Sequence, residues 1–215
     1  ELNDLSKYQF KVLQGQTGSA KTKILNCLNN MNAQVIDLEN LACHRGSLLG
    51  SEINKKQHIQ RYFESLLHSD IDKFDCTKPI FIESESSKIG KLHLPKKLWL
   101  KLNESDRLLL NVPIDERIKF LLKEYKHLTK DCKLIQPFIS GMKGKISNEK
   151  LSNWTNLIQK QDWKNFVKEI LENHYDPKYN FSATKHINKI KHNINILKLN
   201  KLSIDNASKK ILGYF

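Results

Sequence analysis

Eight residues near the N-terminus have the types and spacing of a loop that binds phosphate. The segment Gly15-Gln-Thr-Gly-Ser-Ala-Lys-Thr22 follows a stretch typical of a strand and precedes one typical of a helix. In such a loop, backbone N–H groups and the helix N-terminus surround an anion. The Lys21 ammonium would contact the terminal phosphate oxygens, and the Thr22 hydroxyl would lie where Mg²⁺ is held. The predicted phosphate-binding residues are Gly15, Thr17, Gly18, Ser19, Ala20, Lys21 and Thr22.

One residue of this loop departs from the usual pattern, because Ala20 stands where glycine normally precedes the lysine. We expect the loop to form despite this change, since a helix-like backbone angle would suffice at that position. Gly15 and Gly18 are the positions expected to need the conformational freedom of glycine. A coincidental match in a surface loop is the alternative interpretation.

Two further clusters of polar residues follow predicted strands. His44 and Arg45, in Asp37-Leu-Glu-Asn-Leu-Ala-Cys-His-Arg-Gly-Ser47, offer an imidazole and a guanidinium to an anion, although an ordinary polar loop would look similar. Glu83 ends an apolar stretch, where it could act as a base or hold a Mg²⁺-bound water, the alternative being a solvated acidic turn. Ligands of open α/β sheets bind beyond the carboxyl ends of the strands. We therefore predict His44, Arg45 and Glu83 as catalytic residues.

The apolar pattern of the first half predicts a P-loop NTPase-like α/β domain over residues 1–142, with a parallel sheet flanked by helices. After residue 142 no strand signal is apparent, so we expect residues 143–215 to form an all-helical, basic region. Within it, Ile187, Ile190, Ile194 and Leu197 recur at helical spacing. The expected strands cover residues 10–13, 34–38, 79–83 and 107–112.

The chain carries a formal net charge of +13, and residues 143–215 hold 14 Lys and Arg against 6 Asp and Glu. Such a gradient indicates a polyanionic partner, most often nucleic acid, although an AT-rich genome would also favour lysine codons. No apolar run approaches the length of a membrane span, and no secretion signal is apparent, so we expect a cytoplasmic protein without a membrane partner. Scattered cysteines argue against a zinc site or a disulfide framework.

Five segments, in this order, resemble the phosphate-loop domain of the tRNA 2-selenouridine synthases. They are the phosphate loop, the His-Arg-Gly-Ser segment, Ile82-Glu-Ser-Glu-Ser-Ser-Lys-Ile-Gly90, Val112-Pro-Ile-Asp-Glu-Arg117 and Tyr175-Asp-Pro-Lys-Tyr179. The likeness covers about residues 10–180. This sequence departs from the family pattern at Ala20, Asn40, Cys43 and Ser87. The resemblance implies an anion contact at position 87, where an arginine is common, and Lys88 is the neighbouring residue that we expect to replace it.

The resemblance implies a tRNA-modifying transferase that acts on 2-thiouridine at the wobble position of the anticodon arm. It implies geranyl diphosphate and selenophosphate as substrates, with Mg²⁺ as an optional ion and no tightly bound organic cofactor. A rhodanese-like domain usually precedes the phosphate loop in this family, and nothing before Phe10 could be that domain. Either this chain is a fragment of a longer protein or its rhodanese half is a separate protein, so we expect the selenium step to need a separate rhodanese-like protein or domain. The expected tRNA-binding residues are Arg45, Lys88, Lys185, Lys189 and Lys191.

Two other functions remain compatible with these residues. A small-molecule or nucleoside kinase-like enzyme would use the same loop with ATP and Mg²⁺ and would not need RNA. A non-catalytic RNA-binding module with a relict loop would keep the basic character without the transfer reaction. Copurifying RNA separates the kinase from the two others, and loss of geranyl transfer on loop substitution separates the transferase from the RNA-binding module.

Overall fold

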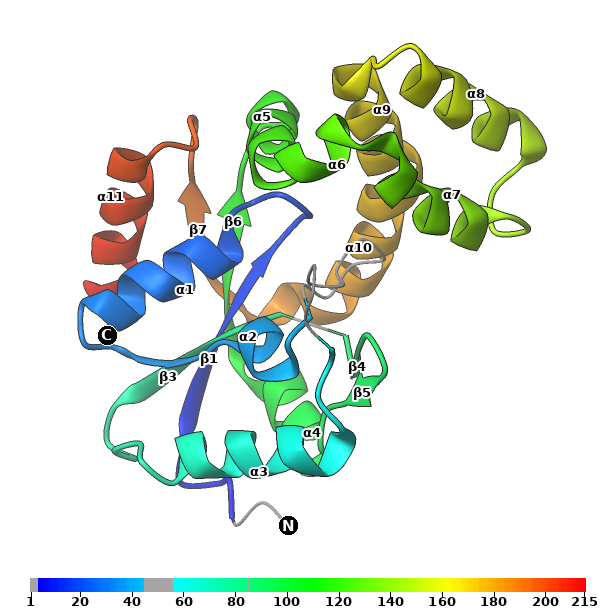
Figure 1. The fold of residues 1–215 in the computed structure, drawn as a ribbon. Helices are drawn as coiled ribbons and strands as arrows, with labels where there is room; N and C mark the ends of the chain where they lie inside the picture. The colour runs from blue at the N-terminus through cyan, green and yellow to red at the C-terminus, as the bar shows by residue number, and fades with distance from the viewer. Residues whose placement is uncertain (1–3, 45–55, 85) are drawn as a thin grey trace.

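A parallel β-sheet forms the centre of the protein. The computed structural model describes residues 4–44, 56–84 and 86–215. Five strands pair in parallel in the order β2-β3-β1-β6-β7, and β4 and β5 form a separate antiparallel hairpin (Figure 1). The strands are β1 (Gln9–Gly15), β2 (Gln34–Ile36), β3 (Pro79–Glu83), β4 (Lys88–Ile89), β5 (Leu92–His93), β6 (Asp106–Asn111) and β7 (Ile190–Asn195). The four predicted strands are confirmed as β1, β2, β3 and β6.

Helices cover both faces of the sheet because neighbouring residues of each strand point to opposite sides. Leu13 packs on the face covered by α1 (Lys21–Asn30) and α11 (Lys201–Leu212). Val12 belongs to the core on the other face of the sheet. Three helices complete this part of the fold: α2 (Leu38–Ala42), α3 (Gln60–Ile71) and α4 (Lys96–Glu104). The observed fold is therefore the predicted α/β arrangement.

A helical lobe with its own core follows the sheet strand β6. Its centre is Trp154, which is fully buried, stacks on Phe138 at 6.2 Å between ring centroids and meets Phe166 edge-on at 6.3 Å. Figure 1 shows this lobe beside the C-terminal edge of the sheet. Its elements are α5 (Ile114–Glu124), α6 (Lys126–Lys130), η1 (Cys132–Ile135), α7 (Gln136–Met142), α8 (Asn148–Gln159) and α9 (Trp163–Ile170).

The chain then returns to the sheet. A π-helical turn, η2 (Leu171–Tyr175), leads into α10 (Asp176–Ala183) and the 3₁₀ helix η3 (Thr184–Lys189). Strand β7 follows and pairs in parallel with β6. None of the helices in the described residues is long and apolar enough to cross a membrane.

The prediction of an all-helical region after residue 142 is wrong at β7. Ile194 is buried, but Ile187 and Leu197 are 63% and 77% exposed, so these residues form no helical stripe. The pattern that decides the structure is the two-residue alternation of β7, whose exposed residues at 191, 193 and 195 alternate with more buried ones. Because β7 and α11 belong to the same sheet and layers as the residues before 142, the α/β fold does not end at that boundary.

Candidate functional site

The phosphate loop lies between the end of β1 and the start of α1, at the carboxyl edge of the sheet. Its lysine is held over the loop, with Lys21 Nζ donating to the Gly15 carbonyl at 2.9 Å. The Ser19 N–H donates to the Gln16 carbonyl at 3.1 Å and closes the turn. Helix α1 begins at Lys21, so its free N-terminal N–H groups face the loop. This arrangement presents one ammonium and several N–H donors to an anion.

The backbone of the loop shows why its small residues are needed. Gly18 has a φ of +83°, and a Cβ there would lie 3.0 Å from the Leu121 side chain. At Gly15 a Cβ would meet the Ser19 Oγ at 2.5 Å. The expectation for Ala20 is wrong, because its φ of 62° and ψ of 30° are left-handed rather than helix-like. The loop must turn sharply before α1, and an L-residue pays about 1–2 kcal/mol for that conformation.

A buried ion pair connects the loop to the start of α10. Arg117 donates to both carboxylate oxygens of Asp176, at 2.9 and 2.8 Å, and also to the Thr17 carbonyl at 3.2 Å. The Arg117 and Asp176 side chains are 4% and 14% exposed. The two family-like segments that end in Arg117 and contain Asp176 thus meet on the phosphate loop. Sequence inspection selected both segments but not this contact, because 59 positions separate the partners.

The π-helical turn η2 sets the register of the residues that follow it. One extra residue in a helical turn rotates all later side chains, and such turns often occur at functional sites. Here Asp176 reaches Arg117, while Tyr175 and Tyr179 reach the pocket beside the loop. His174 is buried against Trp154, with ring centroids 6.4 Å apart. Burial and the neighbouring Lys178 ammonium lower the pKa of His174.

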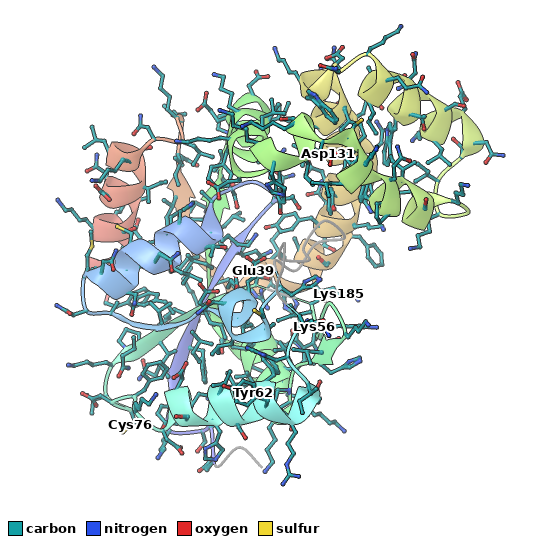
Figure 2. The ribbon with its side chains drawn as sticks, in the orientation of Figure 1. Glu39, Lys56, Tyr62, Cys76, Asp131 and Lys185 are labelled. Atoms are coloured by element: carbon teal, nitrogen blue, oxygen red, sulfur yellow. The ribbon has the colours of Figure 1, made fainter. Side chains whose placement is uncertain are left out.

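Three acidic side chains gather next to Lys21 and Thr22. Glu83 is buried, and its Oε1 accepts the N–H of Glu39 at 3.0 Å. The Thr22 hydroxyl donates to Glu39 Oε2 at 3.2 Å. Asp37 caps α2 by accepting the Asn40 N–H, and burial raises the pKa of Asp37. In Figure 2, Glu39 lies near the centre of the molecule, between the sheet layers and the lobe that carries Asp131.

These residues offer hydroxyl and carboxylate oxygens, which suit Mg²⁺. Within residues 4–44, 56–84 and 86–215, however, no group of three or more His, Cys, Asp or Glu could hold a metal ion. A magnesium ion at Thr22 would therefore rely on oxygens of a bound phosphate, as Mg²⁺ often does. The role of Thr22 in metal binding stays a prediction.

The other predicted site residues divide into two groups. His44 lines the same pocket as the phosphate loop and Glu83, and burial lowers the pKa of its imidazole. Lys88, on β4, is exposed and does not line that pocket. Lys185 and Lys189 on η3 and Lys191 on β7 are also exposed, with Lys185 Nζ 5.4 Å from the centre of the Phe181 ring. Arg45 lies outside the described residues.

The pocket has a volume of about 600 Å³, and its lining is of two chemical kinds, which we call the polar arm and the apolar arm. One arm is polar and contains the phosphate loop, Glu39, His44 and Glu83. The other consists of apolar and aromatic residues of α5, α6 and α9. It is lined by Leu121, Leu128, Trp163, Phe166, Val167 and Ile170. Sequence inspection missed this arm, because the apolar periods of α5 and α9 predict buried helix faces equally well.

The match to a known family agrees with this geometry. A family model described as the tRNA 2-selenouridine synthase AAA domain matches residues 8–141, which is more than half of the chain. The chain belongs to the tRNA 2-selenouridine synthase family. The enzyme of that name from Sulfurovum sp. (strain NBC37-1) is 30% identical over 210 residues, covering 85% of this chain and 57% of that protein. The one from Psychromonas ingrahamii is 22% identical over 215 residues, covering 88% and 58%.

This member of the tRNA 2-selenouridine synthase family spans less than two thirds of the length of those relatives. Among solved structures, shikimate kinase from Bacteroides thetaiotaomicron is 14% identical with a TM-score of 0.41, covering 96% of this chain and 97% of that one. The tRNA delta(2)-isopentenylpyrophosphate transferase from Staphylococcus epidermidis is 13% identical with a TM-score of 0.40, covering 97% and 100%. Similarity at this level adds nothing to the functional argument. By their names, the two relatives are enzymes that act on tRNA.

Proposed function

We propose that this chain transfers a geranyl group from geranyl diphosphate to the sulfur of 2-thiouridine at the wobble position of tRNA. The observation that carries the proposal is that the phosphate loop and the apolar arm line one pocket. A diphosphate with a long apolar chain fits both arms at once. A nucleoside triphosphate would use only the polar one.

The polar arm would stabilise the leaving group. When the thiouridine sulfur bonds to C1 of the geranyl group, the C1–O bond breaks and its electron pair goes to the diphosphate. Negative charge therefore grows at the oxygens that Lys21 and the loop N–H groups face. If Mg²⁺ binds with the diphosphate, the Thr22 hydroxyl and the Glu39 carboxylate are the nearest oxygen ligands, and the ion would neutralise part of that charge.

The apolar arm would bind the ten-carbon chain. Each methylene-sized group removed from water contributes about 0.8 kcal/mol, so even partial burial of the chain outweighs one surface ion pair. Val167 lies on the wall of this arm, and Lys168, the next residue of α9, is exposed. The two positions allow a matched test of where the chain binds.

The acceptor would enter from the side of His44, Glu83 and the C-terminal lysines. Burial lowers the pKa of His44 and so favours its neutral form, whose imidazole would accept the N3 proton that the ring loses on S-alkylation. Arg45 and Lys88, together with Lys185, Lys189 and Lys191, would contact RNA phosphates, which position an RNA without reading its sequence. Conversion to 2-selenouridine would follow with selenophosphate and a rhodanese-like domain.

Binding of pyrophosphate and of geranyl diphosphate to Val167→Trp and Lys168→Trp tests this assignment. Val167→Trp fills the apolar arm, so it should weaken the binding of geranyl diphosphate at least tenfold and leave the binding of pyrophosphate unchanged. The second adds the same ring on the exposed face of α9 and should change neither affinity. If the Val167→Trp protein binds geranyl diphosphate as tightly as the unsubstituted protein does, the geranyl group binds elsewhere.

A further inference from the structure

The apolar arm continues along α9, away from the phosphate loop. Side chains of α9 line the pocket at a helical spacing that places them on one face of the helix, and they are Trp163, Phe166, Val167 and Ile170. Helix α9 passes through η2 into α10 without a break in the chain of helical turns. Figure 1 shows this run leading from the lobe back towards the sheet. The α9 part of the apolar arm is therefore a row of side chains along one helical run.

One contact fixes the end of this row that lies at the loop. Asp176, the first residue of α10, pairs with Arg117, and Arg117 also donates to the Thr17 carbonyl of the loop. Trp163 is the first residue of α9 and so marks the other end of the row. At the usual rise of an α-helix, the axis from Asp176 back to Trp163 is about 20 Å long.

A geranyl group is too short to reach the far end of this row. Its main chain has seven C–C bonds of about 1.5 Å and so spans at most about 11 Å. Measured from Asp176 along the helix, that length ends close to Ile170 and Val167. Phe166 and Trp163 lie beyond it, where their rings meet edge-on with centroids 6.1 Å apart. Trp163 is only half-buried, so an apolar ligand that reaches it would remove more of its ring from water.

Resting on the donor site proposed above, we propose that this site binds prenyl diphosphates longer than geranyl diphosphate, with Trp163 and Phe166 in contact with the third isoprene unit. Farnesyl diphosphate is the ligand of matching length, because the eleven C–C bonds of its main chain span at most about 17 Å and end within the row. Its diphosphate would bind Lys21 and the loop as that of the shorter donor does. Trp163 is then a residue that determines specificity for chain length.

The test is the binding of a series of diphosphates to the whole chain, measured by calorimetry below the concentrations at which the ligands aggregate. The probes are pyrophosphate, dimethylallyl diphosphate, geranyl diphosphate and farnesyl diphosphate. Farnesyl diphosphate should bind more tightly than geranyl diphosphate by roughly tenfold or more, because five further carbons leave water. If it binds no more tightly, this proposal is wrong and the proposed function stands. If geranyl diphosphate binds no more tightly than pyrophosphate, both are wrong.

A substitution at Trp163 tests where the third isoprene unit lies. Trp163→Ala should remove most of the gain from geranyl to farnesyl diphosphate and leave the affinity for dimethylallyl diphosphate unchanged, because the short chain does not reach this ring. Phe181→Ala is the matched control, since its ring belongs to the same helical run, is 73% exposed and does not line the pocket. It should change no affinity in the series. If a Trp163→Ala protein with an unchanged circular dichroism spectrum keeps the full gain, the farnesyl chain lies elsewhere and the proposal is wrong.

Discussion

The buried pair between Arg117 and Asp176 offers the sharpest test of how the phosphate loop is held. Asp176→Asn keeps the shape of the side chain but removes its charge, so Arg117 is left buried beside an amide that both donates and accepts. Removing one partner of a buried pair typically costs about 3–5 kcal/mol. The side chains are 4% and 14% exposed, so solvent can offset little of this loss.

That loss is a large fraction of the roughly 5–15 kcal/mol that stabilises most proteins. For a chain of this length it corresponds to a fall in Tm of about 6–20 °C, at 2–4 °C per kcal/mol. Urea unfolding followed by circular dichroism measures it. The control is Lys119→Ala, which breaks the pair with Glu116, where the lysine is 72% exposed, and it should change the free energy of unfolding far less than Asp176→Asn does.

A second readout links the pair to the site. Arg117 also donates to the Thr17 carbonyl, so Asp176→Asn should weaken pyrophosphate binding under conditions in which the protein is still folded. The double variant Arg117→Met with Asp176→Leu replaces the charged pair by an apolar one. It should recover most of the free energy of unfolding that Asp176→Asn loses. If Asp176→Asn lowers the free energy of unfolding no more than Lys119→Ala does, solvent screens the Arg117–Asp176 pair. That result would contradict its role as a buried ion pair.

Three further predictions concern the loop, the lobe and the basic residues. Lys21→Ala should weaken the binding of pyrophosphate by about 1.5–3 kcal/mol and leave the circular dichroism spectrum unchanged. Undiminished binding would contradict the assignment of the phosphate loop. Because the pKa of His174 is lowered in the folded protein, the unfolded chain binds this proton more readily, and the free energy of unfolding should fall as the pH drops below 6.5. His174→Gln should make that fall smaller, as measured by urea unfolding from pH 7 to pH 5. Neutralising Lys185, Lys189 and Lys191 together should flatten the salt dependence of tRNA binding by roughly one unit of slope per lost contact, whereas a normal slope would place the RNA surface elsewhere.

The parts of the fold that sequence could predict are those set by local patterns. The phosphate loop has a fixed spacing, and β3 was delimited residue for residue because it is a short apolar run with a terminal acid. Strand β7 was missed because it is an edge strand, exposed on alternate residues, and its isoleucines also fit a helical period. Its structure depends on pairing with β6, far away in the sequence.

The candidate site was predictable in its residues more than in its arrangement. The loop, His44 and Glu83 do line one pocket, as strand ends in a parallel sheet should. The apolar arm and the Arg117–Asp176 pair both require contacts between distant segments. The left-handed backbone of Ala20 was missed for a related reason, since the sharp turn before α1 overrides the preference of alanine.

The central claim is that the loop and the apolar arm together transfer a geranyl group to thiouridine. The direct measurement is mass spectrometry of an anticodon stem-loop RNA bearing 2-thiouridine, after incubation with this chain and geranyl diphosphate. We expect the RNA to gain one geranyl group on sulfur, with release of pyrophosphate, and an RNA with uridine at that position to stay unmodified. An unmodified 2-thiouridine RNA, under conditions in which both substrates bind the chain, would contradict the claim.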